Sequence, residues 1–206
     1  MNKYPDLKSA ISLWQESLTG ILSASPSEKI PQEYISHSTG VALAALKIAE
    51  KAGMNKDKAY VLGLLHDYGK IQNEKQSGIA HFIVGYEKMM SLGYTDVARI
   101  CLSHSFPNAD FDFADYTSYS EQDLMKAKQE LKKIVLDDYD RLIQLCDIFF
   151  EANSIVSYQK RIKCIIKRYN LSQEQTKNLE ENASKNKTYF DNRCQCDIYQ
   201  ILGIKE

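Results

Sequence analysis

The feature that most constrains the fold of this 206-residue chain is the nearly continuous 3.6-residue spacing of its apolar side chains. Only four prolines and nine glycines are present to interrupt it, and we find no alternation of the kind that marks strands. The sequence therefore predicts an all-α fold. Helices are expected at about 6–22, 31–52, 56–68, 78–91, 95–105, 121–134, 138–154, 157–169 and 172–186.

Length and charge narrow the class of protein. A chain of 206 residues can bury one sizeable core but is short for two full domains, so we expect a single domain over 1–206. The formal net charge is −1, with 26 basic and 27 acidic residues, so no overall field attracts nucleic acid or an anionic membrane. Nucleic-acid binding is therefore unsupported, and any anion must be bound locally.

Cysteine usage and hydropathy indicate the compartment. Five cysteines, an odd number with no secretory segment near the start, are typical of reduced thiols in the cytoplasm. No apolar run approaches the roughly 20 residues that cross a bilayer, so a soluble protein is expected. Cys194 and Cys196 form a C-x-C pair without the further ligands of a zinc site, and we expect both thiols in a terminal loop.

All four histidines fall within one stretch of the chain, and each is expected on or beside the apolar face of a helix. They are His37, His66, His81 and His104, and His66 is followed at once by Asp67 in "VLGLLHDYGK". One such histidine is more often a hydrogen-bonded core residue than a ligand. Four of them, with none on a polar surface, indicate a buried metal site instead.

A further carboxylate, Asp147, lies within the apolar run "RLIQLCDIFFEA". A buried carboxylate without a partner costs several kcal/mol or binds a proton, so Asp147 needs a cation. The alternative is that it caps a helix end or pairs with an arginine.

The order of these residues resembles that of the HD superfamily of metal-dependent phosphohydrolases, which are all-helical. The segments "HSTGVALAALKIAE" and "GLLHDYGK" are similar to the first two ligand helices of that family. The resemblance covers roughly 30–155, and it implies a helical bundle with additional C-terminal helices over about 156–206. It also implies one divalent ion held by His37, His66, Asp67 and Asp147.

Dinuclear members of the superfamily have two extra histidines, and the segments "GIAHFIVGYEKM" and "CLSHSF" place His81 and His104 in the corresponding positions. In such members the aspartate of the doublet bridges both ions, a role that would fall to Asp67. Lys70 resembles the lysine of the HD-x-x-K pattern and could reach a phosphate oxygen. The alternative for Lys70 is a lysine that complements the dipole at a helix C-terminus.

Imidazole and carboxylate ligands together suit Mn, Fe, Ni, Co or Zn rather than Mg or Ca. The expected reaction is hydrolysis of a phosphomonoester or phosphodiester in a nucleotide-like small molecule, with metal-bound hydroxide as the nucleophile. Asp67 and Lys70 are the expected catalytic residues. The segment 106–120 is expected to form a loop, whose aromatic residues Phe111, Phe113, Tyr116 and Tyr119 could close over a ligand.

Two other functions are compatible with the same residues. A minority branch resembling inositol oxygenase uses a similar ligand set to hold two irons and activate dioxygen. A non-catalytic module that only senses a metal or a nucleotide is the other. Phosphate release favours hydrolysis, oxygen-dependent turnover favours the oxygenase, and ligand binding without turnover favours the sensor.

Overall fold

The computed structural model describes residues 3–24, 29–72, 78–106, 111–112, 119–151, 153–169 and 171–205. Within these ranges the fold is all-α, as predicted, apart from one short hairpin. The elements are α1 (Leu7–Ala24), α2 (Lys29–Lys51), α3 (Lys56–Leu65), the 3-10 turn η1 (Tyr68–Ile71), α5 (His81–Ser91), α6 (Thr95–Ser103), α7 (Glu121–Leu131), α8 (Asp138–Ile148), β1 (Phe150–Glu151), β2 (Ser154–Ile155), α9 (Tyr158–Tyr169), α10 (Gln173–Cys194) and α11 (Ile198–Leu202).

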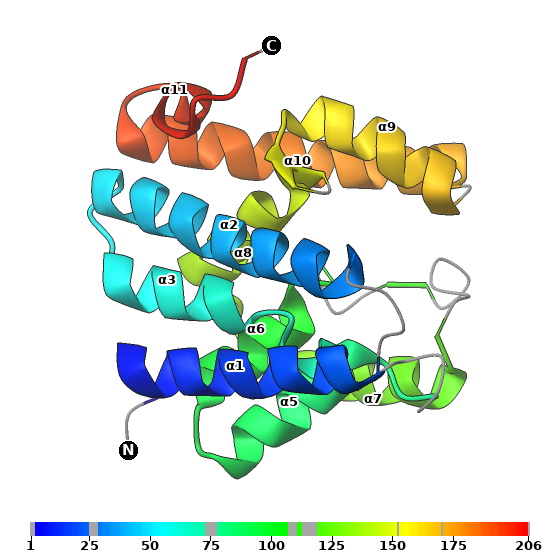
Figure 1. Cartoon of the computed structure of the whole chain (residues 1–206). Coiled ribbons are helices and arrows are strands. Elements are labelled where there is room, and N and C mark those ends of the chain that lie inside the picture. Colours follow the sequence, from blue (N-terminus) through cyan, green and yellow to red (C-terminus); the bar gives the residue numbers. More distant parts are fainter. Residues whose placement is uncertain are drawn as a thin grey trace.

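Helix α2 runs through the middle of the bundle (Figure 1). It packs against α1 and α3 on one side and against α8 and the C-terminal helices α10 and α11 on the other. Helices α5, α6 and α7 form a second group that reaches α3 and α8 through α6. This arrangement brings α2, the end of α3, the start of α5, the end of α6 and the end of α8 close to one another.

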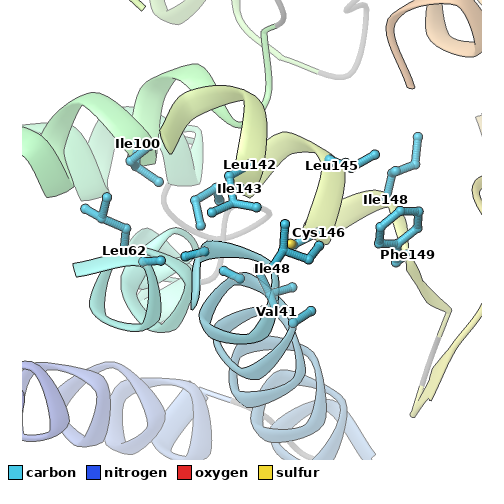
Figure 2. Close-up of a cluster of buried hydrophobic side chains, with 14 of the residues drawn as sticks. Val41, Ile48, Leu62, Ile100, Leu142, Ile143, Leu145, Cys146, Ile148 and Phe149 are labelled. Atoms are coloured by element: carbon cyan, nitrogen blue, oxygen red, sulfur yellow. The ribbon is translucent and has the colours of Figure 1, made fainter. Parts of the chain in front are cut away.

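The main core fills the space between α2, α3, α6 and α8, where apolar side chains gather from all four helices (Figure 2). Val41, Leu62, Ile100 and Ile143 are each no more than about 2% exposed, as the apolar stripes predict. Helices α2 and α3 approach closely because Gly63 has no side chain. A Cβ at that position would lie 2.8 Å from the Cα of Ala42.

Truncating Leu62 to alanine should destabilise the protein by roughly 2–5 kcal/mol, because the side chain is fully buried and leaves a cavity. Chemical denaturation followed by circular dichroism measures this loss. Leu43→Ala on α2 is the matched control, since Leu43 is 51% exposed and should cost less than about 1 kcal/mol. Equal losses in the two variants would contradict the core assigned to α3.

The prediction of one helix over 138–154 is wrong in its last third. Helix α8 ends at Ile148, and Phe150–Glu151 pairs antiparallel with Ser154–Ile155, although no strand was predicted. The hairpin turns at a position that includes Asn153, a residue that favours turns over helix interiors. The apolar run that continues through Phe149 and Phe150 hid this break, because a short apolar run has no clear period.

The helix predicted over 172–186 was also too short. Helix α10 continues to Cys194, where 186 was expected as the end, and α11 was not predicted. The extension is stabilised by the ion pair of Lys187 with Asp191, one turn apart, and by burial of Phe190. Cys194 is therefore a buried helix residue and not a loop thiol, while Cys196 is half-buried in the turn that follows.

Helices α10 and α11 cover one side of α2, and α10 also packs on α8. The division into one domain over 1–206, with a metal-binding core and a C-terminal extension, stays a prediction. None of the helices in the described ranges has both the length and the apolar character needed to span a membrane.

Candidate metal centre

The His66-Asp67 doublet lies at the end of α3, where the chain changes from α-helix to 3-10 turn. The predicted helix to 68 is three residues too long, because α3 ends at Leu65 and η1 begins at Tyr68. Gly69 in η1 allows this turn to pack closely against α5. The backbone there lies so close to the start of α5 that a Cβ would sit 1.8 Å from the carbonyl oxygen of His81.

His66 and His104 each have one ring nitrogen fixed by the backbone. The Nδ1 of His66 lies 2.7 Å from the carbonyl oxygen of Gly63, and the Nδ1 of His104 lies 3.1 Å from that of Ile100. A carbonyl oxygen only accepts hydrogen bonds, so both Nδ1 atoms must carry the proton. In the neutral ring this leaves Nε2 with a free lone pair, which is the form that binds a metal.

The first cluster combines His37 of α2 with the doublet and Asp147 of α8. The Nε2 atoms of His37 and His66 are 3.2 Å apart, and they lie 3.5 and 3.3 Å from Oδ2 of Asp67. The Oδ1 of Asp147 is 2.9 Å from Nε2 of His37 and 3.8 Å from Nε2 of His66. Of the two readings of Asp147, the structure therefore places it against imidazoles rather than against an arginine.

The second cluster combines the same aspartate with His81, the first residue of α5, and His104, which follows α6. The Nε2 atoms of these two histidines are 3.2 Å apart, and each lies 3.5 Å from Oδ1 of Asp67. Asp67 thus directs one carboxylate oxygen to each histidine pair. A carboxylate in this position can be shared by two cations.

The donor atoms fit divalent ions in both clusters. Neighbouring ligands bound at about 2.1 Å to a tetrahedral or octahedral ion lie roughly 3.0–3.4 Å from one another. The observed separations run from 2.9 to 3.8 Å in the first cluster and from 3.2 to 3.5 Å in the second. Two sets of three ligands that share Asp67, one with His37 and His66 and one with His81 and His104, therefore lie at separations suited to transition-metal ions. Asp147 adds a carboxylate oxygen beside His37 in the first cluster.

Electrostatics keep the two carboxyl groups ionised. Burial raises the pKa of Asp67, but the charges of Lys70 and His66 outweigh it and hold the pKa well below its ordinary value. Burial also opposes ionisation of Asp147, and the hydrogen bond and charge of His37 bring its pKa below the ordinary value. Both side chains are therefore carboxylates at neutral pH.

The pKa values of two of the imidazoles, those of His66 and His104, are shifted in opposite directions. Burial lowers the pKa of His104, and the hydrogen bond and charge of Asp67 do not fully offset it. Burial acts in the same direction on His66, but the charges of Asp67 and Asp147 leave its pKa raised. A cation that binds at His66 therefore competes with a proton, and one that binds at His104 meets a neutral ring.

The side chains of the centre differ in their exposure to solvent. The side chain of His66 is fully buried and that of Asp67 is 2% exposed, whereas 31% of Asp147 and 44% of Lys70 are exposed. Lys70 donates to Oδ2 of Asp67 at 2.5 Å. Among these four residues, Asp147 and Lys70 are therefore the ones that solvent reaches, and the ammonium group of Lys70 already lies against the centre.

Two aromatic residues lie near the site. The sequence predicted no role there for Phe150, and it indicated Tyr119 only as one of several loop aromatic residues. The ring of Phe150 packs edge-on against His37, with centroids 6.1 Å apart, and its place in a hairpin was hidden by the helix predicted over it. The ring of Tyr119, one of the aromatic residues that could close over a ligand, has its centroid 6.4 Å from that of His81. Phe111 instead packs in a separate core with Phe106, and Phe113 and Tyr116 lie outside the described residues.

Comparison with known proteins identifies the domain that carries these residues. The family model for the HD domain matches residues 34–150. Ribonuclease Y of Thermotoga petrophila and of Thermotoga maritima is 39% identical over 74 residues, and that of Thermosipho melanesiensis is 35% identical over the same length. The aligned part is 35% of this chain but only 14% of these relatives. No solved structure gives a significant match.

Proposed function

Because the chain belongs to the HD domain family of metal-dependent phosphohydrolases, we propose that it hydrolyses a phosphomonoester or phosphodiester bond in a nucleotide-like small molecule. The observation that carries the proposal is the position of Asp67, which offers one carboxylate oxygen to each of two histidine pairs. This is the arrangement that a two-ion hydrolytic centre requires.

We assign His37, His66, Asp67 and Asp147 to the first ion, and Asp67, His81 and His104 to the second. The mixture of imidazole and carboxylate ligands favours Fe, Mn, Ni, Co or Zn. When bound, such ions polarise a phosphate oxygen and lower the pKa of water towards neutrality. The protein holds the ligands rigidly, because four of the six are no more than 9% exposed.

Lys70 would orient the substrate. Its ammonium group is held beside the centre by Asp67 and is partly exposed to solvent. Once Asp67 is engaged by cations, the lysine can turn to a phosphate oxygen and stabilise the negative charge that develops there. Lys70→Met should therefore raise KM and lower kcat while leaving the metal content unchanged.

The proposal is tested on protein purified without chelator. Metal content is measured by mass spectrometry, and phosphate release is followed with p-nitrophenyl phosphate esters and a panel of nucleotides. Short single-stranded RNA belongs in the panel, since the relatives are named ribonucleases. Two transition-metal ions per chain with hydrolysis of at least one phosphate ester is the expected result, and metal-loaded protein that cleaves none of them would refute the proposal.

The number of ions is tested by removing one histidine of the second cluster. His81→Ala or His104→Ala should leave one ion per chain where the wild type holds two, since neither side chain is part of the first cluster. One ion per chain in the wild type and in both variants would mean that the centre is mononuclear, and two ions in all three would mean that the second ion is not held by these histidines.

A di-iron oxygenase is the second candidate, because a carboxylate shared between two histidine pairs also suits a pair of irons. Oxygen consumption coupled to turnover of an organic substrate, with a mixed-valence signal in electron paramagnetic resonance, would favour it. A protein that binds metal or nucleotide without turnover would instead be a sensor.

A further inference from the structure

One face of α8 contacts both halves of the candidate centre. Asp140, Gln144 and Asp147 are spaced i, i+4 and i+7 and therefore lie along the same side of the helix. Asp147 is directed at His37 in the first cluster. The other two residues contact the segment at the end of α6, which carries His104.

Gln144 bonds to the backbone on both sides of His104. Its side-chain amide donates to the carbonyl oxygen of Ser103 at 2.8 Å and, more weakly, to that of Phe106 at 3.4 Å. The last carbonyl groups of a helix have no i+4 partner within the helix. The carbonyl oxygen of Ser103 accepts a turn bond from the backbone N–H of Phe106, at 3.1 Å, and can accept a second bond from outside the helix. Gln144 supplies that second bond and thereby attaches the residues that flank the ligand to α8.

Asp140 fixes the same segment through a side chain. The hydroxyl of Ser103 donates to Oδ1 of Asp140 at 2.6 Å, and both residues are at most about 1% exposed. Asp140 is itself held by the backbone N–H of Asp137, at 2.7 Å, and by Arg99, whose Nε lies 3.4 Å away. The end of α6 is therefore attached to α8 at a buried point and at a half-buried one.

We infer that Gln144 is a positioning residue for the second ion. By fixing the chain on both sides of His104, it sets the distance between the Nε2 of His104 and the carboxylate of Asp67, while α8 places Asp147 in the first cluster. This inference rests on the proposed function, because it requires that both clusters hold ions. Residues that hold a metal ligand in position without binding the metal themselves typically contribute roughly 10–100-fold to metal affinity.

The test is a titration of the chelator-stripped full-length chain with Mn²⁺, which resolves a first and a second binding step. In Gln144→Met, which keeps the length of the side chain but removes the donor, the first dissociation constant should be unchanged. The second should rise by roughly 10–100-fold. Gln144→Glu, which is polar and of the same size but has no donor facing the carbonyl oxygens, should show the same selective loss. Gln129→Met, at an exposed position on α7, is the matched control and should bind both ions as the wild type does.

The outcomes separate the inference from the proposed function. A wild type that binds two ions, with an unchanged second step in both Gln144 variants, overturns the inference and leaves the two-ion centre intact. A wild type that binds fewer than two ions overturns the two-ion centre and the inference together. Loss of both steps in both variants, accompanied by loss of helicity, would show a purely structural role for Gln144 and would also overturn the inference.

Discussion

Asp67→Ala is expected to lose both ions and essentially all hydrolytic activity while remaining helical. Its two oxygens lie 3.3 to 3.5 Å from the Nε2 atoms of all four histidines, and among the described residues no other side chain belongs to both clusters. The activity should fall by more than the roughly 10²–10³-fold that follows loss of one transition-state donor. On the same sample, mass spectrometry measures the metal content and circular dichroism measures the helicity.

His66→Ala is the companion variant. The ring belongs to the first cluster only, and its loss leaves that cluster with one imidazole and two carboxylates, so we expect loss of metal retention and of activity. Asp57→Ala, an exposed carboxylate in the first turn of the same helix, is the control for the loss of an acidic side chain and should retain both ions. Metal content unchanged from the wild type in Asp67→Ala would remove the basis of the proposed function.

The sequence predicted most of the fold because apolar periodicity and helix-ending residues are local signals. Helices α1, α2, α6 and α9 begin and end within about two residues of the predicted bounds. The failures have a different origin. The hairpin after α8 depends on how Phe150 packs near His37, and the length of α10 depends on burial of Phe190, which are contacts between distant segments.

The candidate site was predictable from residue type and order, but its geometry was not. The positions of the four histidines and of Asp67 and Asp147 in the sequence indicated a shared metal site. The structure brings the histidines and Asp67 together in two clusters and places Asp147 against His37 of the first. The supporting role of Gln144 leaves no pattern in the sequence, because a half-buried glutamine on a helix is common. Its role becomes visible only in the structure, where it donates to the carbonyl oxygens on either side of His104.

Gly69→Ala should destabilise the protein by roughly 3 kcal/mol, since an added methyl group has no space between η1 and α5. It would meet the carbonyl oxygen of His81 at 1.8 Å and the backbone nitrogen of Gly85 at 2.7 Å. Both are backbone atoms, so relief requires α5 to move as a unit. His81 is the first residue of α5 and would move with it.

The variant should therefore lose the second ion as well as stability, whereas an ordinary glycine substitution affects stability alone. Gly53→Ala is the matched control, because Gly53 has a φ of +68° and no atom within 4 Å of an added Cβ. It should cost roughly 1 kcal/mol through backbone strain and keep both ions. Chemical denaturation and Mn²⁺ titration of both variants test the pair. If Gly69→Ala binds the second ion as tightly as Gly53→Ala does, the position of His81 does not depend on the contact between η1 and α5.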